Sequence, residues 1–211
     1  MQPLRRIAVL VSGRGTNLQS ILNAVASGSL DATVVVVLSN RKEALGLVRA
    51  REAGVDAIYR DPRQYGDRDA YDGATAKELR AREVDLVCLA GYVRLVGPAL
   101  LDAFPNRILN IHPSLLPSFP GLEAQRQALE HGVKVSGATV HLVTAELDGG
   151  PIILQSAVPV LSGDSVESLS ARILVEEHRL YPDALRIMLA GGWRVEGRRF
   201  VHAGPSDDSR R

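Results

Sequence analysis

The chain has 211 residues, with 25 Lys and Arg against 24 Asp and Glu, which gives a formal net charge of +1 at pH 7. A composition that is 45% hydrophobic and 23% charged excludes a disordered or collagen-like chain, and the balanced charge argues against a surface built for nucleic acid or anionic lipid. The single cysteine excludes a disulfide framework and a cysteine-based zinc site, and no apolar run approaches the roughly 20 residues of a membrane span.

A strand-like segment begins at Leu4, almost at the start of the chain, which leaves no room for a signal peptide. We therefore expect a cytoplasmic protein with one domain over residues 1–190. The tail at 191–211 can form a small hairpin. His, Asp and Glu residues show no metal-ligand spacing, so no metal is expected.

The first half of the chain alternates apolar runs with segments of helical periodicity. Strands are expected at residues 4–11, 32–38, 55–59, 85–90 and 107–111. Helices are expected from residue 16 and at residues 43–53, 68–81 and 98–103. Thr16 and Gln19 are placed as a capping box for the first helix. The β–α alternation predicts an α/β fold with a doubly wound, mostly parallel sheet.

The pattern changes after residue 112, where Pro113, Pro117 and Pro120 exclude regular structure from a loop. The elements expected beyond this loop are a helix at 123–130, strands at 134–144 and 151–160, and a long helix capped by Asp164 or Ser165. The two strands are expected to pair antiparallel, so the sheet would end in an antiparallel C-terminal part. Pro182 should kink or end the long helix.

A glycine-rich turn, Ser12-Gly13-Arg14-Gly15-Thr16-Asn17-Leu18, joins the first strand to the first helix. Its backbone N–H groups would lie at a helix N-terminus, where these donors and the helix dipole stabilise an anion. Leu18 stands where the dinucleotide fingerprint has a third small residue, and no Walker-type lysine follows. The turn therefore suits a single phosphate, unless its glycines serve only to allow positive φ.

Asn110 and His112 lie two residues apart at the end of a predicted strand, so their side chains would project to the same side. Open α/β sheets bind their ligands at this end of the strands. An amide donor beside an imidazole suits an oxyanion, because Asn donates a hydrogen bond and His can donate one or move a proton. The alternative is that His112 is a structural histidine.

Asp148 belongs to an Asp-Gly pair, which is common in hairpin turns. Beside an imidazole, its carboxylate would raise the histidine pKa toward or above neutrality. The sequence alone does not bring Asp148 to His112, so both interpretations stand. His141 is likewise open to a packing role or a role in supporting the site.

Four blocks in this order together resemble the folate-dependent formyltransferase family. They are Val11-Ser12-Gly13-Arg14-Gly15-Thr16-Asn17-Leu18, Leu89-Ala90-Gly91-Tyr92-Val93-Arg94-Leu95, Leu109-Asn110-Ile111-His112-Pro113-Ser114-Leu115-Leu116-Pro117, and Glu146-Leu147-Asp148-Gly149-Gly150-Pro151-Ile152-Ile153-Leu154-Gln155. The third and fourth blocks are specific to the family, and the first block is similar to its glycinamide ribonucleotide branch. The similarity runs from the first strand to about Pro182.

The resemblance implies a Rossmann-like formyltransferase fold and a reaction of de novo purine biosynthesis. In that reaction the formyl group of the co-substrate 10-formyltetrahydrofolate passes directly to the amine of glycinamide ribonucleotide. The implied catalytic residues are Asn110 and His112, which would stabilise the oxyanion, and Asp148, which would keep His112 charged. Implied partners are small-molecule substrates, with no nucleic acid and no membrane, and the chain is expected to be a monomer or a homodimer.

The resemblance also implies binding residues for both substrates. The ribonucleotide would contact Gly15, Thr16 and Asn17 through its phosphate, and Glu177 on the long helix. The folate would contact Arg68, Val93, Arg94, Leu95, Val96, Asn110, Thr144, Ala145, Glu146, Leu147 and Asp148.

Three positions depart from the family pattern. Arg14 occupies a variable position in the phosphate turn, where it either adds charge or faces water. Leu174 stands where a polar contact to the ribonucleotide would be plausible, so none is expected from it. Val93 is smaller than the Met expected at its position, which leaves the shape of the folate pocket open.

Other functions need features that this sequence does not have. A formyltetrahydrofolate hydrolase would use the same three residues, but an additional N-terminal regulatory domain would be expected. Formyl transfer to initiator tRNA is disfavoured because a second domain is missing and the net charge is near zero. A non-catalytic nucleotide-binding module would leave Asn110, His112 and Asp148 without a purpose.

Overall fold

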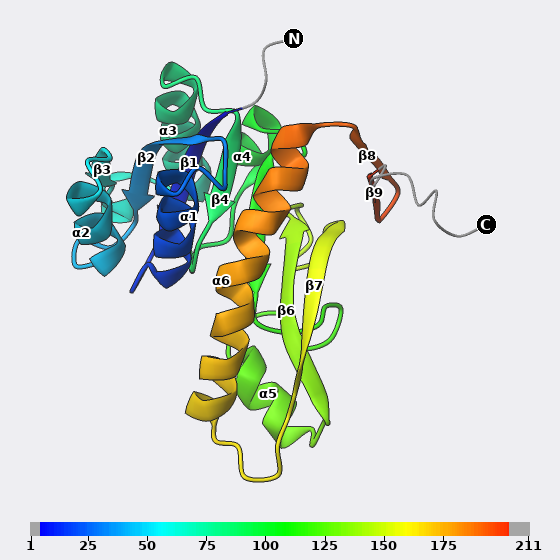
Figure 1. The fold of residues 1–211 in the computed structure, drawn as a ribbon. Coiled ribbons are helices and arrows are strands. Elements are labelled where there is room, and N and C mark those ends of the chain that lie inside the picture. Colours follow the sequence, from blue (N-terminus) through cyan, green and yellow to red (C-terminus); the bar gives the residue numbers. More distant parts are fainter. Residues whose placement is uncertain (1–4, 203–211) are drawn as a thin grey trace.

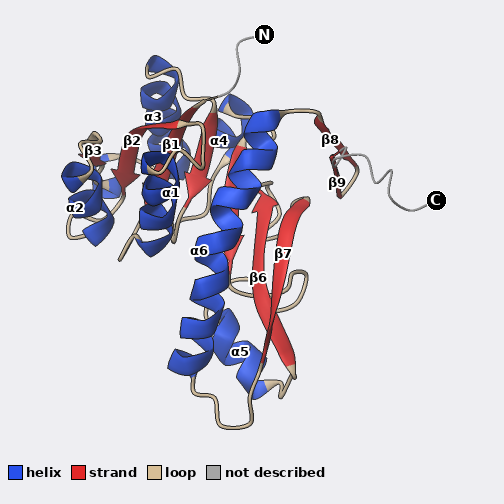
Figure 2. Cartoon of the chain, viewed as in Figure 1, coloured by secondary structure: helices blue, strands red, loops and turns tan. Residues whose placement is uncertain are grey.

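Strand β1 (Arg6–Val11) lies inside the molecule because its apolar side chains alternate between two buried layers. Ile7 and Val9 belong to one layer, and Ala8 and Leu10 belong to the other. The computed structural model describes residues 5–202, in which helices cover both faces of one sheet (Figure 1, Figure 2).

The sheet of the described residues has nine strands in the order β3-β2-β1-β4-β5-β6-β7-β9-β8. The strands after β1 are β2 (Thr33–Ser39), β3 (Ala57–Tyr59), β4 (Leu86–Leu89), β5 (Ile108–His112), β6 (Val135–Leu142), β7 (Ile152–Pro159), β8 (Trp193–Glu196) and β9 (Arg199–His202). Strands β1 to β5 pair in parallel, whereas β6 pairs antiparallel with both β5 and β7. The predicted doubly wound sheet with an antiparallel C-terminal part is confirmed.

The helices separate into two groups according to the apolar layer that they cover. Helices α1 (Thr16–Ala26), α2 (Leu45–Glu52), α5 (Ala124–Glu130) and α6 (Val166–Ala190) cover one layer, and α3 (Arg68–Ala81) and α4 (Pro98–Ala103) cover the other. A short 3-10 helix, η1 (Pro62–Gln64), precedes α3. Figure 1 shows α6 running along the sheet beside α1 and beside strands β6 and β7.

The order of the strands reverses at β1, which has β2 on one side and β4 on the other. Open α/β sheets bind ligands at the carboxyl ends of the strands on either side of such a reversal. Residues 12–17 follow β1 and residues 90–97 follow β4. Because β1 and β4 are paired neighbours, the predicted phosphate-binding segment at 12–17 and the segment at 90–97, which contains predicted folate-binding residues, start side by side.

The predicted capping box of the first helix is wrong. Gly15, in the left-handed conformation with φ 70°, is the N-cap of α1, and no side chain caps the helix. Gly15 packs so closely on α2 that a Cβ there would lie 2.6 Å from Gly46 Cα. This packing places Thr16 in the first turn, and Gln19 instead donates a side-chain hydrogen bond to Asn23.

Pro182 does not end the last helix, because α6 continues to Ala190. The missing N–H costs one backbone hydrogen bond, but Pro182 and its neighbours are buried against the sheet. The Tyr181 hydroxyl also lies 3.1 Å from the carbonyl oxygens of both Leu89 and Leu109. Burial and this anchor hold the helix in one piece.

The ends of several elements differ slightly from the prediction. Helix α2 begins at Leu45, two residues later than expected. Strands β8 and β9 pair antiparallel and form the small hairpin expected in the tail. The remainder of that tail, 203–211, lies outside the described residues, as do residues 1–4, which include Leu4, the first residue of the first predicted strand. No helix between residues 5 and 202 is long and apolar enough to span a membrane.

Candidate functional site

Asn110 and His112 lie within the last three positions of β5, separated by Ile111, and the antiparallel neighbour β6 adds the polar side chain of His141. In the register of these strands Asn110 lies opposite His141 and His112 lies opposite Thr139. The Asn110 Nδ2 atom lies 3.2 Å from His141 Nε2. The His112 and His141 side chains are almost completely buried.

Asp148 reaches this pair from the turn between β6 and β7. Its Oδ2 atom lies 3.5 Å from His112 Nδ1, and its Oδ1 atom lies 3.6 Å from His141 Nε2. Asp148 has φ 49°, a left-handed conformation that Asp adopts more readily than most residues. The Asp-Gly turn thus also points a carboxylate at the end of β5, so the structure brings Asn110, His112 and Asp148 together.

The proline-rich loop after β5 holds both His112 and Asp148. The His112 Nε2 atom lies 2.8 Å from the carbonyl oxygen of Phe119, and because a carbonyl only accepts, Nε2 carries a proton. The N–H of Gly121 donates to Asp148 Oδ2 over 2.7 Å. The orientation of the imidazole and of the carboxylate therefore depends on this loop.

Burial lowers the pKa of His112 below its usual value, and this effect outweighs the raising influence of the Phe119 carbonyl and of the Asp148 carboxylate. This direction differs from the expectation that Asp148 keeps His112 charged. The physical reason is that removal of the imidazole from water disfavours its cation more than one carboxylate at 3.5 Å restores it.

For Asp148 the balance is reversed. Burial by itself would raise the pKa of its carboxyl group, but hydrogen bonding with His141, the Gly121 N–H and the nearby His112 together bring the pKa below its usual value. Asp148 is therefore ionised near neutral pH.

His141 belongs to the cluster, although the sequence did not decide between its two roles. Its Nδ1 atom lies 2.9 Å from the Leu142 carbonyl oxygen, so Nδ1 carries a proton and Nε2 faces Asn110 and Asp148. The signal that was available is the expected antiparallel arrangement of the strand that contains His141. Its pairing with β5, opposite Asn110, is visible only in the register.

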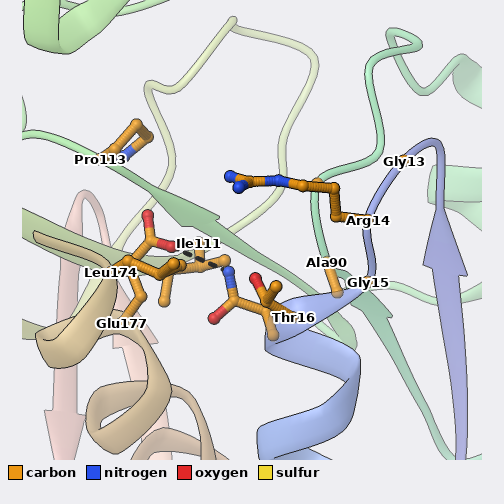
Figure 3. Close-up of a pocket in the computed structure, with 11 residues that line it drawn as sticks. Gly13, Arg14, Gly15, Thr16, Ala90, Ile111, Pro113, Leu174 and Glu177 are labelled. Atoms are coloured by element: carbon orange, nitrogen blue, oxygen red, sulfur yellow. Dashed lines mark hydrogen bonds between the residues drawn. The ribbon is translucent and has the colours of Figure 1, made fainter. Parts of the chain in front are cut away.

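A cavity of about 230 Å³ opens at the N-terminus of α1, beside the cluster (Figure 3). Its lining residues are Gly13, Arg14, Gly15, Thr16, Asn17, Ala90, Gly91, Ile111, Pro113, Leu174 and Glu177. Ile111 and Pro113 flank His112 in the chain, so the cavity adjoins the end of β5 that carries the polar cluster. The predicted phosphate residues, the first turn of α1 and Glu177 share one cavity.

Helix α2 fixes the backbone of the phosphate turn. The Gly46 N–H donates to the Gly13 carbonyl over 3.1 Å, and Arg49 Nε donates to the Arg14 carbonyl over 2.9 Å. These carbonyl groups are therefore occupied on the α2 side. The first N–H groups of α1 have no intrahelical acceptors and no side-chain cap, which suits an anion in the cavity.

Glu177 crosses from α6 to the phosphate turn, where its Oε2 atom accepts a hydrogen bond from Asn17 Nδ2 over 2.9 Å. This bond is the dashed line of Figure 3. Burial raises the pKa of Glu177, although the hydrogen bond from Asn17 and the charge of Arg14 act in the opposite direction. A buried carboxyl group at the edge of a cavity can accept hydrogen bonds from ligand hydroxyl groups.

The segment after β4 holds the predicted folate residues Val93 to Val96, and Ser12 joins it to the phosphate turn. The Val93 N–H donates to Ser12 Oγ over 3.0 Å, and Ser12 Oγ donates to Asn40 over 2.6 Å. Val93 and Leu95 are more than half exposed. Ser12, which the sequence did not single out as a folate-side residue, thus connects the two predicted binding segments.

Arg94 and Arg68 lie on the α3 side of this segment. The Arg94 guanidinium carbon stacks 4.6 Å from the centre of the Tyr71 ring, so this side chain packs on α3. Arg68 is exposed, and its Nε atom lies 3.2 Å from the place that a Cβ at Gly97 would take. Arg94 thus joins the segment that follows β4 to α3, and Arg68, the first residue of α3, lies beside Gly97 at the end of that segment.

The segment from Thr144 to Leu147 leads from β6 into the Asp148 turn. Ala145, Glu146 and Leu147 are exposed, and Glu146 pairs with Arg198 at 3.1 Å. Their predicted contacts with folate remain predictions. Between residues 5 and 202, no group of three or more His, Cys, Asp or Glu residues is arranged to hold a metal.

Several known proteins resemble this chain in sequence and in fold. The family described as formyl transferase matches residues 5–185. The phosphoribosylglycinamide formyltransferase of Escherichia coli is 44% identical over 196 residues, which cover 93% of this chain and 90% of the relative. The crystal structure of glycinamide ribonucleotide transformylase 1 from Symbiobacterium toebii is 62% identical with a TM-score of 0.93, and the match covers 95% of this chain and 94% of that chain. A formyltetrahydrofolate deformylase from Pseudomonas syringae is 30% identical with a TM-score of 0.84, and this chain spans 66% of its length.

Proposed function

This chain belongs to the formyl transferase family, and from that membership we propose that it transfers the formyl group of 10-formyltetrahydrofolate to the amine of glycinamide ribonucleotide in purine biosynthesis. The observation that carries the proposal is the cavity at the N-terminus of α1, whose wall at β5 adjoins the cluster of Asn110, His112 and Asp148. A phosphate at the helix end would leave the rest of a ribonucleotide directed toward that cluster.

The chemistry is a direct transfer between two nitrogen atoms. The amine nitrogen forms a bond to the formyl carbon, and the electron pair of the C=O π bond moves to the formyl oxygen. When that pair returns, the bond between the formyl carbon and N10 of the folate breaks. The amine loses a proton and N10 gains one, so atoms and charge balance.

The polar cluster supplies what this sequence of steps requires. The Asn110 amide can donate a hydrogen bond to the developing oxyanion, and His112 could donate a second one from Nδ1 once this nitrogen is protonated, since Nε2 is held by the Phe119 carbonyl. Asp148 is ionised, so it can accept the proton that the amine loses, directly or through a water molecule. His112 Nδ1 and Asp148 Oδ2 lie 3.5 Å apart, so a proton would pass between them once the two atoms approach to hydrogen-bond distance.

His112 would become charged during the reaction by taking, through Asp148, the proton that the amine loses, and it would give this proton up again as N10 gains one. Burial keeps its pKa low in the free protein, so the imidazole is neutral near pH 7. A negative charge on the formyl oxygen would stabilise the imidazolium beside it. The proposed role of Asp148 is therefore to favour the charged imidazole when the oxyanion forms.

The folate-derived formyl donor would occupy the space between two exposed segments. These are residues 93–96 after β4 and residues 144–148 before β7, together with Arg68 and Asn110. Main-chain groups of both segments and exposed apolar side chains such as Leu95 and Leu147 would meet the pterin. The chain is proposed to work in the cytoplasm as a monomer or homodimer without a metal.

Consumption of 10-formyltetrahydrofolate by the purified protein tests this function. We expect turnover only when glycinamide ribonucleotide is present, with one formylated product per folate consumed. Turnover at a similar rate with water as the acceptor would contradict the proposal and favour a hydrolase. The hydrolase is the less favoured alternative, because the deformylase is 30% identical whereas two transferases are 44% and 62% identical.

A further inference from the structure

The cavity at the N-terminus of α1 is poor in positive charge for a site that would hold a phosphate. Among its eleven lining residues only Arg14 and Glu177 have ionisable side chains, so Arg14 is the one cation in the described lining. Leu174, on the α6 wall, adds neither a charge nor a hydrogen bond. A phosphate dianion would thus meet the N–H groups of α1, a buried carboxyl group and a single guanidinium.

Arg14 is available to bind a ligand. Its side chain is exposed, and it makes no ion pair with any residue in the part of the chain that the structure describes. In Figure 3 the side chain extends from the turn across the cavity toward the wall formed by Pro113, Leu174 and Glu177. Burial raises the pKa of Glu177, and the hydrogen bond from Asn17 and then the charge of Arg14 oppose this rise, as expected for a guanidinium near that carboxyl group.

The backbone of Arg14 is held in place while its side chain is not. The hydrogen bond from Arg49 Nε to the Arg14 carbonyl, at 2.9 Å, anchors the residue on α2. Arg49 also donates to Gln19 on α1 over 3.0 Å, so it joins both helices around the turn. The backbone of Arg14 is therefore anchored at the cavity, and its side chain is free to turn toward a ligand.

A second group in the cavity also lacks a partner. Asn17 is 8% exposed, and its Oδ1 atom is buried without a hydrogen bond from any described residue, although its Nδ2 atom donates to Glu177. A buried acceptor without a donor is costly, so Asn17 is a second polar group of the cavity wall whose hydrogen bonding is incomplete.

We propose that Arg14 binds the phosphate of the acceptor from the open side of the cavity and so makes the site selective for phosphorylated acceptors. This inference rests on the proposed function. In this chain the cation that binds the phosphate would come from the glycine-rich turn. The facing α6 wall cannot supply one, because Leu174 there is apolar and Glu177 is acidic. The guanidinium would close over a phosphate whose other oxygens face the first N–H groups of α1.

Substitution of Arg14 by Gln, with Arg14→Lys as a second variant, tests the inference through steady-state kinetics. For R14Q we expect KM for glycinamide ribonucleotide to rise about 10- to 100-fold, because a charge-assisted contact is lost. The kcat and the KM for the folate should not change. R14K should fall between R14Q and the wild type, because lysine keeps the charge but not the planar fork. Arg51→Gln, an exposed arginine on α2 outside the cavity, is the matched control and should behave as the wild type.

Whether Arg14 acts on the phosphate group is tested with an acceptor that lacks it, the 5′-dephosphorylated riboside. R14Q should use this riboside as well as the wild type does, so that the variant loses the preference for the phosphorylated acceptor. The dependence of KM on salt concentration should also become weaker in R14Q. An equal loss for both acceptors, a KM change below twofold, or a fall in kcat at unchanged KM would each overturn the role of Arg14.

Binding of ribose 5-phosphate, measured by calorimetry, separates this inference from the proposed function. If the wild type shows no formyl transfer, the proposed function fails, but weaker binding of ribose 5-phosphate to R14Q than to R51Q still supports Arg14 as the phosphate ligand. If transfer is normal and both variants bind ribose 5-phosphate equally, the inference about Arg14 fails and the proposed function stands.

Discussion

The ionisation of single residues in the cluster follows from competition between burial and nearby charge. The His112 side chain is 6% exposed, so the loss of water lowers its pKa although Asp148 lies 3.5 Å away. Asp148 has a comparable exposure of 9%, but it accepts hydrogen bonds and its pKa is lowered. At the scale of residues, the structure therefore favours a neutral imidazole beside an ionised carboxylate.

Replacement of Asp148 by Asn should lower the pKa of His112 still further, because it removes the charge that raises this pKa. The measurement is a pH titration of the His112 ring signals by NMR. Asp102→Asn, which neutralises an exposed carboxylate on α4, should leave the titration unchanged. An unchanged or raised His112 pKa in D148N would contradict the assigned interaction. The same variant should alter the height or the acidic limb of the pH–rate profile.

Replacement of His112 by Ala should lower kcat by two to three orders of magnitude, about 3–4 kcal/mol of barrier, if the imidazole stabilises the oxyanion. Binding of the ribonucleotide should change little, since His112 does not line the cavity at α1. Steady-state kinetics and calorimetry measure the two effects separately. His202→Ala, on β9, controls for the loss of an imidazole elsewhere and should retain activity. An unchanged kcat in H112A would refute the catalytic assignment.

At the scale of elements, the site depends on how closely the first two βα units pack. Gly15 allows α1 to begin where its backbone touches α2, with Gly46 Cα 2.6 Å from the place of a Cβ. The same contact turns the carbonyl groups of Gly13 and Arg14 toward α2. The capping motif in the sequence does not form, because this contact between helices decides where α1 starts.

Gly15→Ala should therefore destabilise the protein more than Gly28→Ala. Both glycines have positive φ, near 70°, so both substitutions carry the same backbone strain of about 1–2 kcal/mol. Only at Gly15 does the new methyl group meet backbone atoms, whereas nothing lies within 4 Å at Gly28. Urea denaturation measures the difference in the free energy of unfolding. Equal losses for the two variants would show that the contact with α2 is not tight.

At the scale of the whole molecule, buried ionisable groups make stability depend on pH in opposite directions. The pKa of Glu177 is raised in the folded protein, so the folded state binds more protons and the stabilisation is present at low pH and lost as pH rises through the folded pKa. The lowered pKa values of His112 and Asp148 act the other way, and their contributions are lost as pH falls.

Glu177→Gln isolates the first of these contributions. Gln keeps an oxygen that can accept from Asn17 Nδ2, but it has no charge to bury. We expect the free energy of unfolding of E177Q, relative to the wild type, to increase as pH rises from about 4.5, the usual range of Glu. Denaturant unfolding between pH 4 and pH 8 measures this difference. A difference that is independent of pH, or that decreases, would show that the Glu177 pKa is not raised by burial.

Most of the architecture follows from local patterns, and these were sufficient to predict it. Alternating apolar side chains and helical periodicity predicted the order of the strands and helices and the antiparallel end of the sheet. They could do so because the spacing of apolar residues along the chain shows which faces of an element are buried. The motifs predicted which residues form the site, since Asn110 and His112 had to project from the same strand end. The sequence did not show whether Asp148 lies close to Asn110 and His112, because it is far from them along the chain.

Features that depend on segments far apart in the chain could be read only from the folded protein. It brings the Asp148 turn to β5 through the register of β6, adds His141 to the cluster, and lets α6 pass Pro182 because the surrounding burial offsets one lost hydrogen bond. It also sets the direction of the His112 pKa, which depends on how completely the imidazole is removed from water. Local spacing in the sequence was enough to predict the elements and to single out Asn110 and His112 as candidate catalytic residues, because both depend on neighbours along the chain. Only the folded chain decided their contacts and charge states, because these depend on packing between residues far apart in the sequence.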